Sequence, residues 1–208
     1  GAEGAEGAEG AEGGRLLLIL RGLPGSGKSS IVRAIAAACR HGASASAGEA
    51  VAVCSADHFF EGGAGKSQKQ LRALLDPGEP PTRTAVYRAC FDVSLLQAAH
   101  DACRAACVRA MAGCVPLVLI DNTHATREQY AFYARQGAQR GYGVGVLEVS
   151  CDSDAQLLAF HARGSHAVPL PAMRAMAAKW EADADAVQLN PAAANPPPAA
   201  AAAPTESV

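Results

Sequence analysis

The 208-residue chain carries 18 Lys and Arg against 20 Asp and Glu, a formal net charge of −2. A nucleic-acid partner would therefore need a local basic patch, because the charge of the whole protein does not attract one. No apolar run approaches the ~20 residues that span a bilayer, and the N-terminus lacks the basic and apolar segments of a signal peptide, so we expect a cytoplasmic or nuclear protein with no membrane partner.

Two low-complexity ends flank the part of the chain that can fold. Residues 1–14 open with four copies of Gly-Ala-Glu, and residues 191–208 are rich in Ala and Pro. Neither end carries enough apolar side chains to offset the entropy lost on ordering, so we expect both to be disordered. Residues 15–190 remain, a length that suits one α/β domain with a substantial core.

The first predicted element is a strand over residues 16–20, a continuous apolar run typical of a parallel strand covered on both faces. It is followed by Gly22-Leu23-Pro24-Gly25-Ser26-Gly27-Lys28-Ser29, which matches the P-loop pattern G-x-x-x-x-G-K-[ST]. An Ala-rich, helix-prone segment over 31–39 comes next. Strand, glycine loop and helix therefore stand in the order that phosphate binding requires.

The residue types of this loop indicate what it binds. Its glycines allow successive backbone N–H groups to turn inward around a phosphate, and the helix adds the partial positive charge of its N-terminus. The Lys28 ammonium would lie on the β and γ phosphates, and the Ser29 hydroxyl would be a Mg²⁺ ligand. We therefore expect ATP and Mg²⁺ as ligands; the alternative is a Gly-rich turn with an incidental lysine. The predicted ATP-binding residues are Gly22, Leu23, Pro24, Gly25, Ser26, Gly27, Lys28, Ser29 and Ser30.

A second short strand is expected over residues 50–54, and Asp57 follows it closely. In parallel sheets ligands lie beyond the carboxyl ends of the strands, which would place Asp57 on the same edge as the phosphate loop. A carboxylate there could accept the proton of an attacking hydroxyl. A solvated turn or a helix N-cap is the alternative interpretation of this residue.

The middle of the chain predicts a long loop and a long helix. Residues 61–84 hold several glycines and prolines and are expected to form a loop with a short helix over 68–75. From 92 to 111 small and apolar residues recur three or four apart, which predicts one buried helix face with Gly113 as its stop.

On that helix His100, Cys103 and Cys107 share one face. Three such side chains resemble part of a zinc site, but no C-x₂-C pair completes it and the neighbouring positions are mostly Ala. Packing of the cysteines in the core is the alternative, and the composition favours it.

A third apolar strand over residues 115–120 ends directly in Asp121. A carboxylate at this point is typical of the second Mg²⁺-side residue of a P-loop enzyme. We therefore predict Ser29 and Asp121 as the metal residues.

The remaining elements continue the alternation of strand and helix. They are a helix from a capping box at Thr126 to Gln139, a strand over 143–149, a helix from a second capping box at Ser153 to Arg163, and a helix from Val168 to Glu181 with proline in its first turn. This order predicts an α/β fold of the P-loop NTPase type, a parallel sheet with helices on both faces.

Arg163 lies between the last two predicted helices, where a guanidinium could approach the transferring phosphoryl group. A helix-terminal arginine bonded to a carbonyl is the alternative. His166 and Arg174 belong to the same set, and His166 could equally be a packing residue. The predicted catalytic residues are therefore Asp57, Arg163 and Lys28.

The chain resembles the polynucleotide-kinase-like P-loop family, which includes 5′-hydroxyl polynucleotide kinases and the zeta-toxin-like and NEDD4-binding-protein-like kinase domains. Four blocks carry the resemblance: Arg21 to Ser29, Ser55-Ala56-Asp57-His58-Phe59-Phe60, Ile120-Asp121-Asn122-Thr123, and Arg163-Gly164-Ser165-His166-Ala167-Val168-Pro169. The chain differs from the phage-type enzymes at His58 and Phe60, where they have an acid and an arginine. It also carries His124 where Asn is usual, and a longer 61–84 insertion.

The resemblance implies that Asp57 is the general base and that Arg163 stabilises the transition state. It implies an ATP-dependent kinase, residues 15–190, that phosphorylates a hydroxyl such as the 5′-hydroxyl of a nucleic acid or nucleotide. A kinase of a small metabolite or charged tRNA, and an ATP-binding interaction module without turnover, remain as alternatives.

Overall fold

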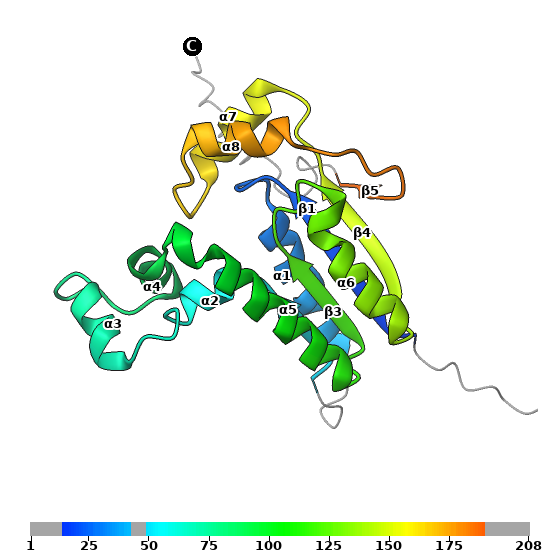
Figure 1. Cartoon of the computed structure of the whole chain (residues 1–208), viewed down its shortest axis with the longest axis horizontal. Coiled ribbons are helices and arrows are strands. Elements are labelled where there is room, and N and C mark those ends of the chain that lie inside the picture. The colour runs from blue at the N-terminus through cyan, green and yellow to red at the C-terminus, as the bar shows by residue number, and fades with distance from the viewer. Residues whose placement is uncertain (1–13, 43–48, 190–208) are drawn as a thin grey trace, which may run out of the picture.

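The computed structural model describes residues 14–42 and 49–189; the predicted disordered ends lie almost entirely outside them. Its centre is a five-stranded sheet in the order β2-β3-β1-β4-β5, and every pair of neighbouring strands is parallel (Figure 1). The strands are β1 Leu16–Gly22, β2 Val51–Cys54, β3 Leu117–Asp121, β4 Gly143–Val149 and β5 Val187–Gln188. The sequence predicts the first four; β5 has too few residues to show a periodic pattern.

Helices connect the strands, as parallel pairing requires. They are α1 Lys28–Gly42, α2 Asp57–Glu61, α3 Gln68–Leu74, α4 Arg83–Cys90, α5 Leu96–Ala112 with the preceding 3₁₀ turn η1 Val93–Leu95, α6 Arg127–Gln139, α7 Asp154–Arg163 and α8 Leu170–Ala178.

Alternate residues of β1 face the two helical layers. Leu17 and Ile19 pack in the cluster that holds the buried residues of α5 and α6, whereas Leu20 packs with Val32 and Ala36 of α1. All three leucine and isoleucine side chains are fully buried, as expected of a central strand in a covered parallel sheet. The arrangement confirms the α/β P-loop fold with helices on both faces.

The helices α7 and α8 lie together at the end of the sheet where β1 ends (Figure 1). Their buried residues Leu157, Phe160 and Met173 form a cluster with Leu23 of the P-loop and Val149 of β4. The segment that joins the two helices is thereby held beside the P-loop.

The structure corrects three details of the predicted elements. α4 begins in the last residues of the expected 61–84 loop and forms a helix that the sequence does not predict. At its start the Thr82 hydroxyl accepts a hydrogen bond from the Ala85 N–H. Its eight residues follow a proline-rich stretch and give little periodic signal. The capping box at Ser153 is only half formed, because the Gln156 side chain accepts from the Asp152 N–H instead. The last helix ends at Ala178, before Glu181.

A buried ion pair lies at the base of the P-loop. Arg21, the last residue before the loop glycine, is fully buried, and its Nη1 lies 3.0 Å from the Glu148 carboxylate on β4. The Trp180 indole N–H donates to the other oxygen of Glu148 at 3.1 Å, and the Trp180 ring lies 4.6 Å from the guanidinium carbon. The charge is therefore enclosed by a carboxylate and an aromatic face.

The same guanidinium donates to three backbone carbonyls in two separate segments of the chain. The acceptors are His124 and Ala125 in the segment after β3, each at 3.2 Å, and Glu181 after α8 at 2.6 Å. Arg21 thus ties β1 to β4, to the end of β3 and to the segment after α8. The sequence places Arg21 beside a motif but does not reveal these partners.

We expect Glu148→Gln to lower the free energy of unfolding by about 3–5 kcal/mol, because it leaves the buried guanidinium without its countercharge. Asp154→Asn breaks the exposed Arg174–Asp154 pair and is the matched control, with an expected loss within about 1 kcal/mol. Urea unfolding at pH 7 measures both. Similar losses for the two variants would contradict a structural role for the buried pair.

Candidate active site

The P-loop runs from Gly22 to the first turn of α1, and its backbone is anchored by a hydrogen bond from the Gly22 N–H to the Thr123 carbonyl at 3.0 Å. Gly25 has a φ of +72°, a conformation that favours glycine. A Cβ at this position would also clash with the carbonyl oxygen of Phe160 in α7. Only glycine therefore allows the loop and the end of α7 to lie this close.

Lys28 is the loop's cation, and its side chain is directed inward. Its Nζ donates to the Leu23 carbonyl at 3.1 Å, and the residue is only 7% exposed. Burial lowers the pKa of Lys28, while the carboxylates of Asp121 and Asp57 act in the opposite direction. The two acids identified from the sequence therefore lie close enough to Lys28 to act on its charge.

Two serines of the loop have different surroundings. Ser26 is almost fully buried, and its hydroxyl has no hydrogen-bond partner in the described part of the chain. Ser29, in the first turn of α1, is exposed. Asp121 pairs in register with Leu20 of β1, so its carboxylate lies at the strand edge from which the loop departs. The oxygen ligands of Ser29 and Asp121 fit a hard cation such as Mg²⁺.

Asp57 is the first residue of α2, and hydrogen bonds across the sheet edge fix the turn that carries it. The Ser55 hydroxyl donates to the Asp121 carbonyl at 2.8 Å, and the Ala56 N–H donates to the Asn122 side-chain oxygen at 2.9 Å. Asn122 is buried. These bonds bring Asp57 to the edge that holds Asp121, as the sequence predicted, although the sequence did not reveal the role of Asn122.

The environment of Asp57 shifts its pKa above that of an ordinary aspartate. Burial raises the pKa of Asp57, and the nearby carboxylates of Asp121 and Glu61 raise it further, while His166 and Lys28 lower it. The side chain is still 44% exposed, so an acceptor can reach it. A carboxylate that is both accessible and more basic than usual suits proton abstraction from a hydroxyl.

The structure brings Arg163 to the P-loop. Its Nε donates to the Gly25 carbonyl at 2.5 Å and its Nη2 to the Ser26 carbonyl at 3.2 Å, with the Phe160 ring 4.7 Å from the guanidinium carbon. The arginine therefore bonds carbonyls of the loop. Arg174 lies elsewhere, paired with Asp154 on the exposed side of α7.

The two cysteines on the helix face that also carries His100 pack in the core, as the alternative interpretation expected. Cys103 and Cys107 are buried in the core, and Cys103 accepts a hydrogen bond from the Tyr133 hydroxyl at 3.3 Å. His100 is exposed. Within residues 14–42 and 49–189 there is no group of three or more His, Cys, Asp or Glu side chains that could hold a metal ion.

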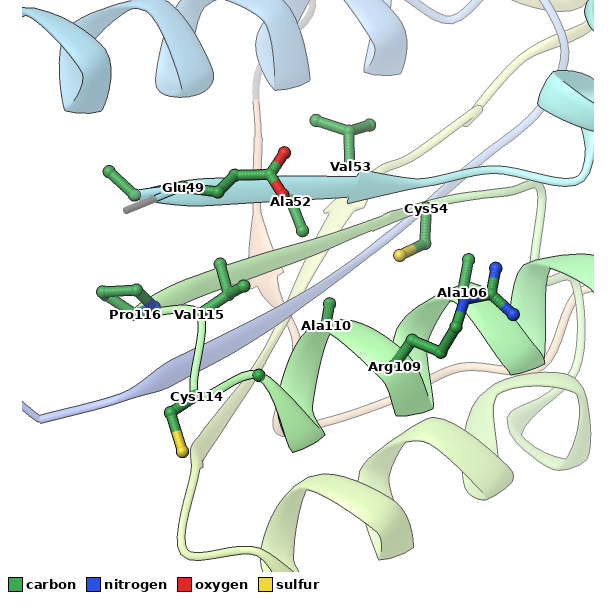
Figure 2. Close-up of a pocket in the computed structure, with 12 residues that line it drawn as sticks. Glu49, Ala52, Val53, Cys54, Ala106, Arg109, Ala110, Cys114, Val115 and Pro116 are labelled. Atoms are coloured by element: carbon green, nitrogen blue, oxygen red, sulfur yellow. The ribbon is translucent and has the colours of Figure 1, made fainter. Parts of the chain in front are cut away.

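A pocket of about 870 Å³ lies away from these groups, between β2 and α5. Figure 2 shows Cys54 of β2 facing Ala106 and Ala110 of α5 across it. Burial raises the pKa of the Cys54 thiol, so at neutral pH the thiol stays protonated and is not a nucleophile. The pocket includes none of the P-loop residues, and its lining offers no chemistry that the sequence singled out.

His124, which stands where the resembled family usually has Asn, proves to be a structural residue. Its Nδ1 donates to the Leu20 carbonyl at 3.0 Å, and its ring lies 5.8 Å from that of Tyr130 and 5.7 Å from that of Tyr133. Burial lowers the pKa of His124 to about 3. The imidazole is therefore neutral at pH 7, and it bonds the backbone of β1 two residues before the P-loop begins.

No family model matches the sequence, and no curated protein matches it. Among solved structures, a gluconokinase from Sinorhizobium meliloti 1021 is similar with a TM-score of 0.47 and 15% identity over 85% of this chain and 83% of that one. The structure of APE1195 is similar with a TM-score of 0.43 and 17% identity over 72% of this chain and 66% of that one. Likeness at this level identifies no family, so the polynucleotide-kinase-like resemblance stays a prediction.

In the described part of the chain no helix is long and apolar enough to cross a membrane.

We expect His124→Asn to flatten the dependence of stability on pH. Between pH about 6.5 and about 3 the unfolded His124 binds a proton that the folded one does not, so the wild type loses about 1.4 kcal/mol per pH unit from this group as the pH falls. Urea unfolding of both proteins at pH 7, 6 and 5 measures the difference. Parallel pH curves for the two proteins would contradict a buried neutral imidazole.

Gly25→Ala should weaken ATP binding at least tenfold, because the clash with Phe160 separates α7 from the loop. Gly78→Ala is the matched control: its φ is +86°, but a Cβ there meets no atom within 4 Å. Both variants carry the cost of about 1–2 kcal/mol for a left-handed alanine. ATP titration by calorimetry should show the loss only for Gly25→Ala, and equal affinities would refute the close approach.

Proposed function

We propose that this chain is an ATP- and Mg²⁺-dependent kinase that transfers the γ-phosphoryl group to a hydroxyl. The acceptor we propose first is the 5′-hydroxyl of a polynucleotide or nucleotide. The observation that supports it best is the gathering of Lys28, Asp57 and Asp121 beside the P-loop at one edge of the sheet. A nucleotide-binding loop alone serves many functions. An accessible carboxylate next to that loop can accept the proton of an attacking hydroxyl, which supports phosphoryl transfer to a hydroxyl.

In the proposed reaction the loop N–H groups and Lys28 bind the phosphates of ATP. Asp57 takes the proton of the acceptor hydroxyl while the hydroxyl oxygen forms a bond to the γ-phosphorus, and the bond from that phosphorus to the bridging oxygen of ADP breaks. Ser29 and Asp121 would hold Mg²⁺, which neutralises phosphate charge when bound. The remaining catalysis is positioning and charge stabilisation.

Arg163 is proposed as the cation that neutralises charge on the transferring group. Its guanidinium is already bonded to the carbonyls of Gly25 and Ser26, so it lies against the loop that would surround the phosphates. In this role it exchanges a loop carbonyl for a phosphoryl oxygen, which is the stronger hydrogen-bond partner because it is charged.

A small-metabolite acceptor is the second candidate, and the position of Phe60 favours it. Where the resembled phage-type enzymes have an arginine, Phe60 is 1% exposed and packs against Tyr87 and Phe91. It offers no charge to a nucleic-acid phosphate. A charged tRNA or a nucleotide remains compatible with the same phosphate loop and base.

Asp57→Asn should lower the transfer of label from γ-labelled ATP by about 10²–10⁴-fold, because the amide cannot accept the hydroxyl proton. The affinity for ATP should stay within about threefold of wild type, since the P-loop is intact. Asp76→Asn, at an exposed position of the loop between α3 and α4, is the control and should transfer at the wild-type rate. Equal loss of transfer and of ATP binding in Asp57→Asn would remove Asp57 from the role of base.

The acceptor is found by offering labelled ATP with 5′-hydroxyl oligonucleotides, nucleotides, tRNA and small hydroxyl metabolites. Binding of a nucleic-acid acceptor should weaken steeply with salt, whereas binding of an uncharged metabolite should not. A wild-type protein that binds ATP and labels none of these acceptors would instead support an interaction module without turnover.

A further inference from the structure

One short segment contacts both the P-loop and the proposed base. Arg163, at the end of α7, donates to the carbonyls of Gly25 and Ser26. Three residues later His166 reaches the other side of the site, with its Nε2 3.6 Å from an Asp57 carboxylate oxygen. The segment from Arg163 to His166 therefore spans the site from the nucleotide side to the acceptor side.

The imidazole of His166 has a defined orientation. Its ring centre lies 4.0 Å from that of Tyr87 on α4, with 36° between the planes, and its side chain is 26% exposed. Its Nδ1 is shielded from solvent and has no hydrogen-bond partner in the described part of the chain. A carboxylate can only accept hydrogen bonds, so Nε2 is the ring atom of His166 that can act as a donor toward Asp57.

The backbone after His166 turns sharply to allow this orientation. Ala167 has a φ of +48°, the left-handed region that a non-glycine residue seldom adopts. The next residue, Val168, packs against the cluster of α7, α8 and Leu23. Because such a conformation persists only where the surroundings fix it, the placement of His166 is set by packing on both sides.

Charges from several elements act on Asp57. The acids are Asp121 on β3 and Glu61 on α2, and the cation is Lys28 on α1. Burial raises the pKa of Tyr87 on α4, and the Asp57 carboxylate beside its phenol raises it further. Burial and the two acids disfavour the ionised carboxylate that a base must be, while His166 and Lys28 favour it.

We propose that His166 is a positioning residue for Asp57: its Nε2, 3.6 Å from one carboxylate oxygen, attracts that oxygen and so fixes the direction in which the base meets the acceptor hydroxyl. The proposal rests on the proposed kinase function. His166 itself loses and gains no proton in the reaction: the hydroxyl proton passes to Asp57, the hydroxyl oxygen bonds to the γ-phosphorus, and ADP leaves.

Steady-state kinetics of two variants with Mg²⁺, ATP and an acceptor from the panel test this role. His166→Ala should lower kcat at least tenfold with KM for ATP within about twofold of wild type. His166→Gln should recover most of the loss, because its side-chain NH₂ can donate to Asp57 from a similar position. The matched control is His161→Ala: His161 lies on the same helix as Arg163, is exposed, and forms no side-chain hydrogen bond within the described residues.

A double-mutant cycle separates positioning from a general loss of structure. In the Asp57→Asn background, His166→Ala should reduce the residual rate less than twofold, since the base it positions is gone. Wild-type kcat in His166→Ala, or the same fold loss with and without Asp57, would overturn the proposal. Thermal unfolding of each variant checks that the fold is kept.

The two proposals fail in different ways. A wild-type protein that labels no acceptor would refute the kinase function, and the positioning role of His166 with it. An active wild type whose His166→Ala variant has unchanged kinetics would refute only the positioning role.

Discussion

The parallel pairing of β3 between β1 and β2 is the constraint on which the site depends. It sets the carboxyl ends of three strands side by side, so that the P-loop, Asp57 and Asp121 meet although they are distant in sequence. Strand pairing sets where the strands end but does not set the path of the turns that follow them. The bonds from Ser55 and to Asn122 complete the placement, because they join the turn after β2 to the end of β3. A change in register would separate Asp57 from the P-loop.

Packing around the P-loop supports this edge from two directions. The buried Arg21 and Glu148 hold the base of the loop to β4 and to the carbonyls after β3 and α8. The end of α7 lies against Gly25, where no side chain would fit. These contacts hold the loop in place, which would reduce the ordering that phosphate binding requires. The same packing carries Arg163 and His166 to opposite sides of the site.

The sequence predicts the parts of the site that are encoded locally. The P-loop is one continuous motif, and Asp57 and Asp121 follow apolar strands whose ends must share an edge in a parallel sheet. The contacts of Arg21 with Glu148 and of His166 with Asp57 join residues from different elements, so no local pattern reveals them. α4 was missed because it is short, and the structural role of His124 depends on burial behind β1. The acceptor is not encoded in any motif of the chain, and the comparisons with known proteins do not supply it.

The central claim is that the Asp57 carboxylate faces the terminal phosphate of ATP across a space that a hydroxyl can fill. A crystal structure with Mg²⁺ and a non-hydrolysable ATP analogue measures this directly. We expect the γ-phosphate within the loop of Lys28, with a carboxylate oxygen of Asp57 turned toward it and a gap of one oxygen atom between them. An Asp57 side chain directed away from the γ-phosphate, or protein atoms filling the gap, would exclude Asp57 as the base.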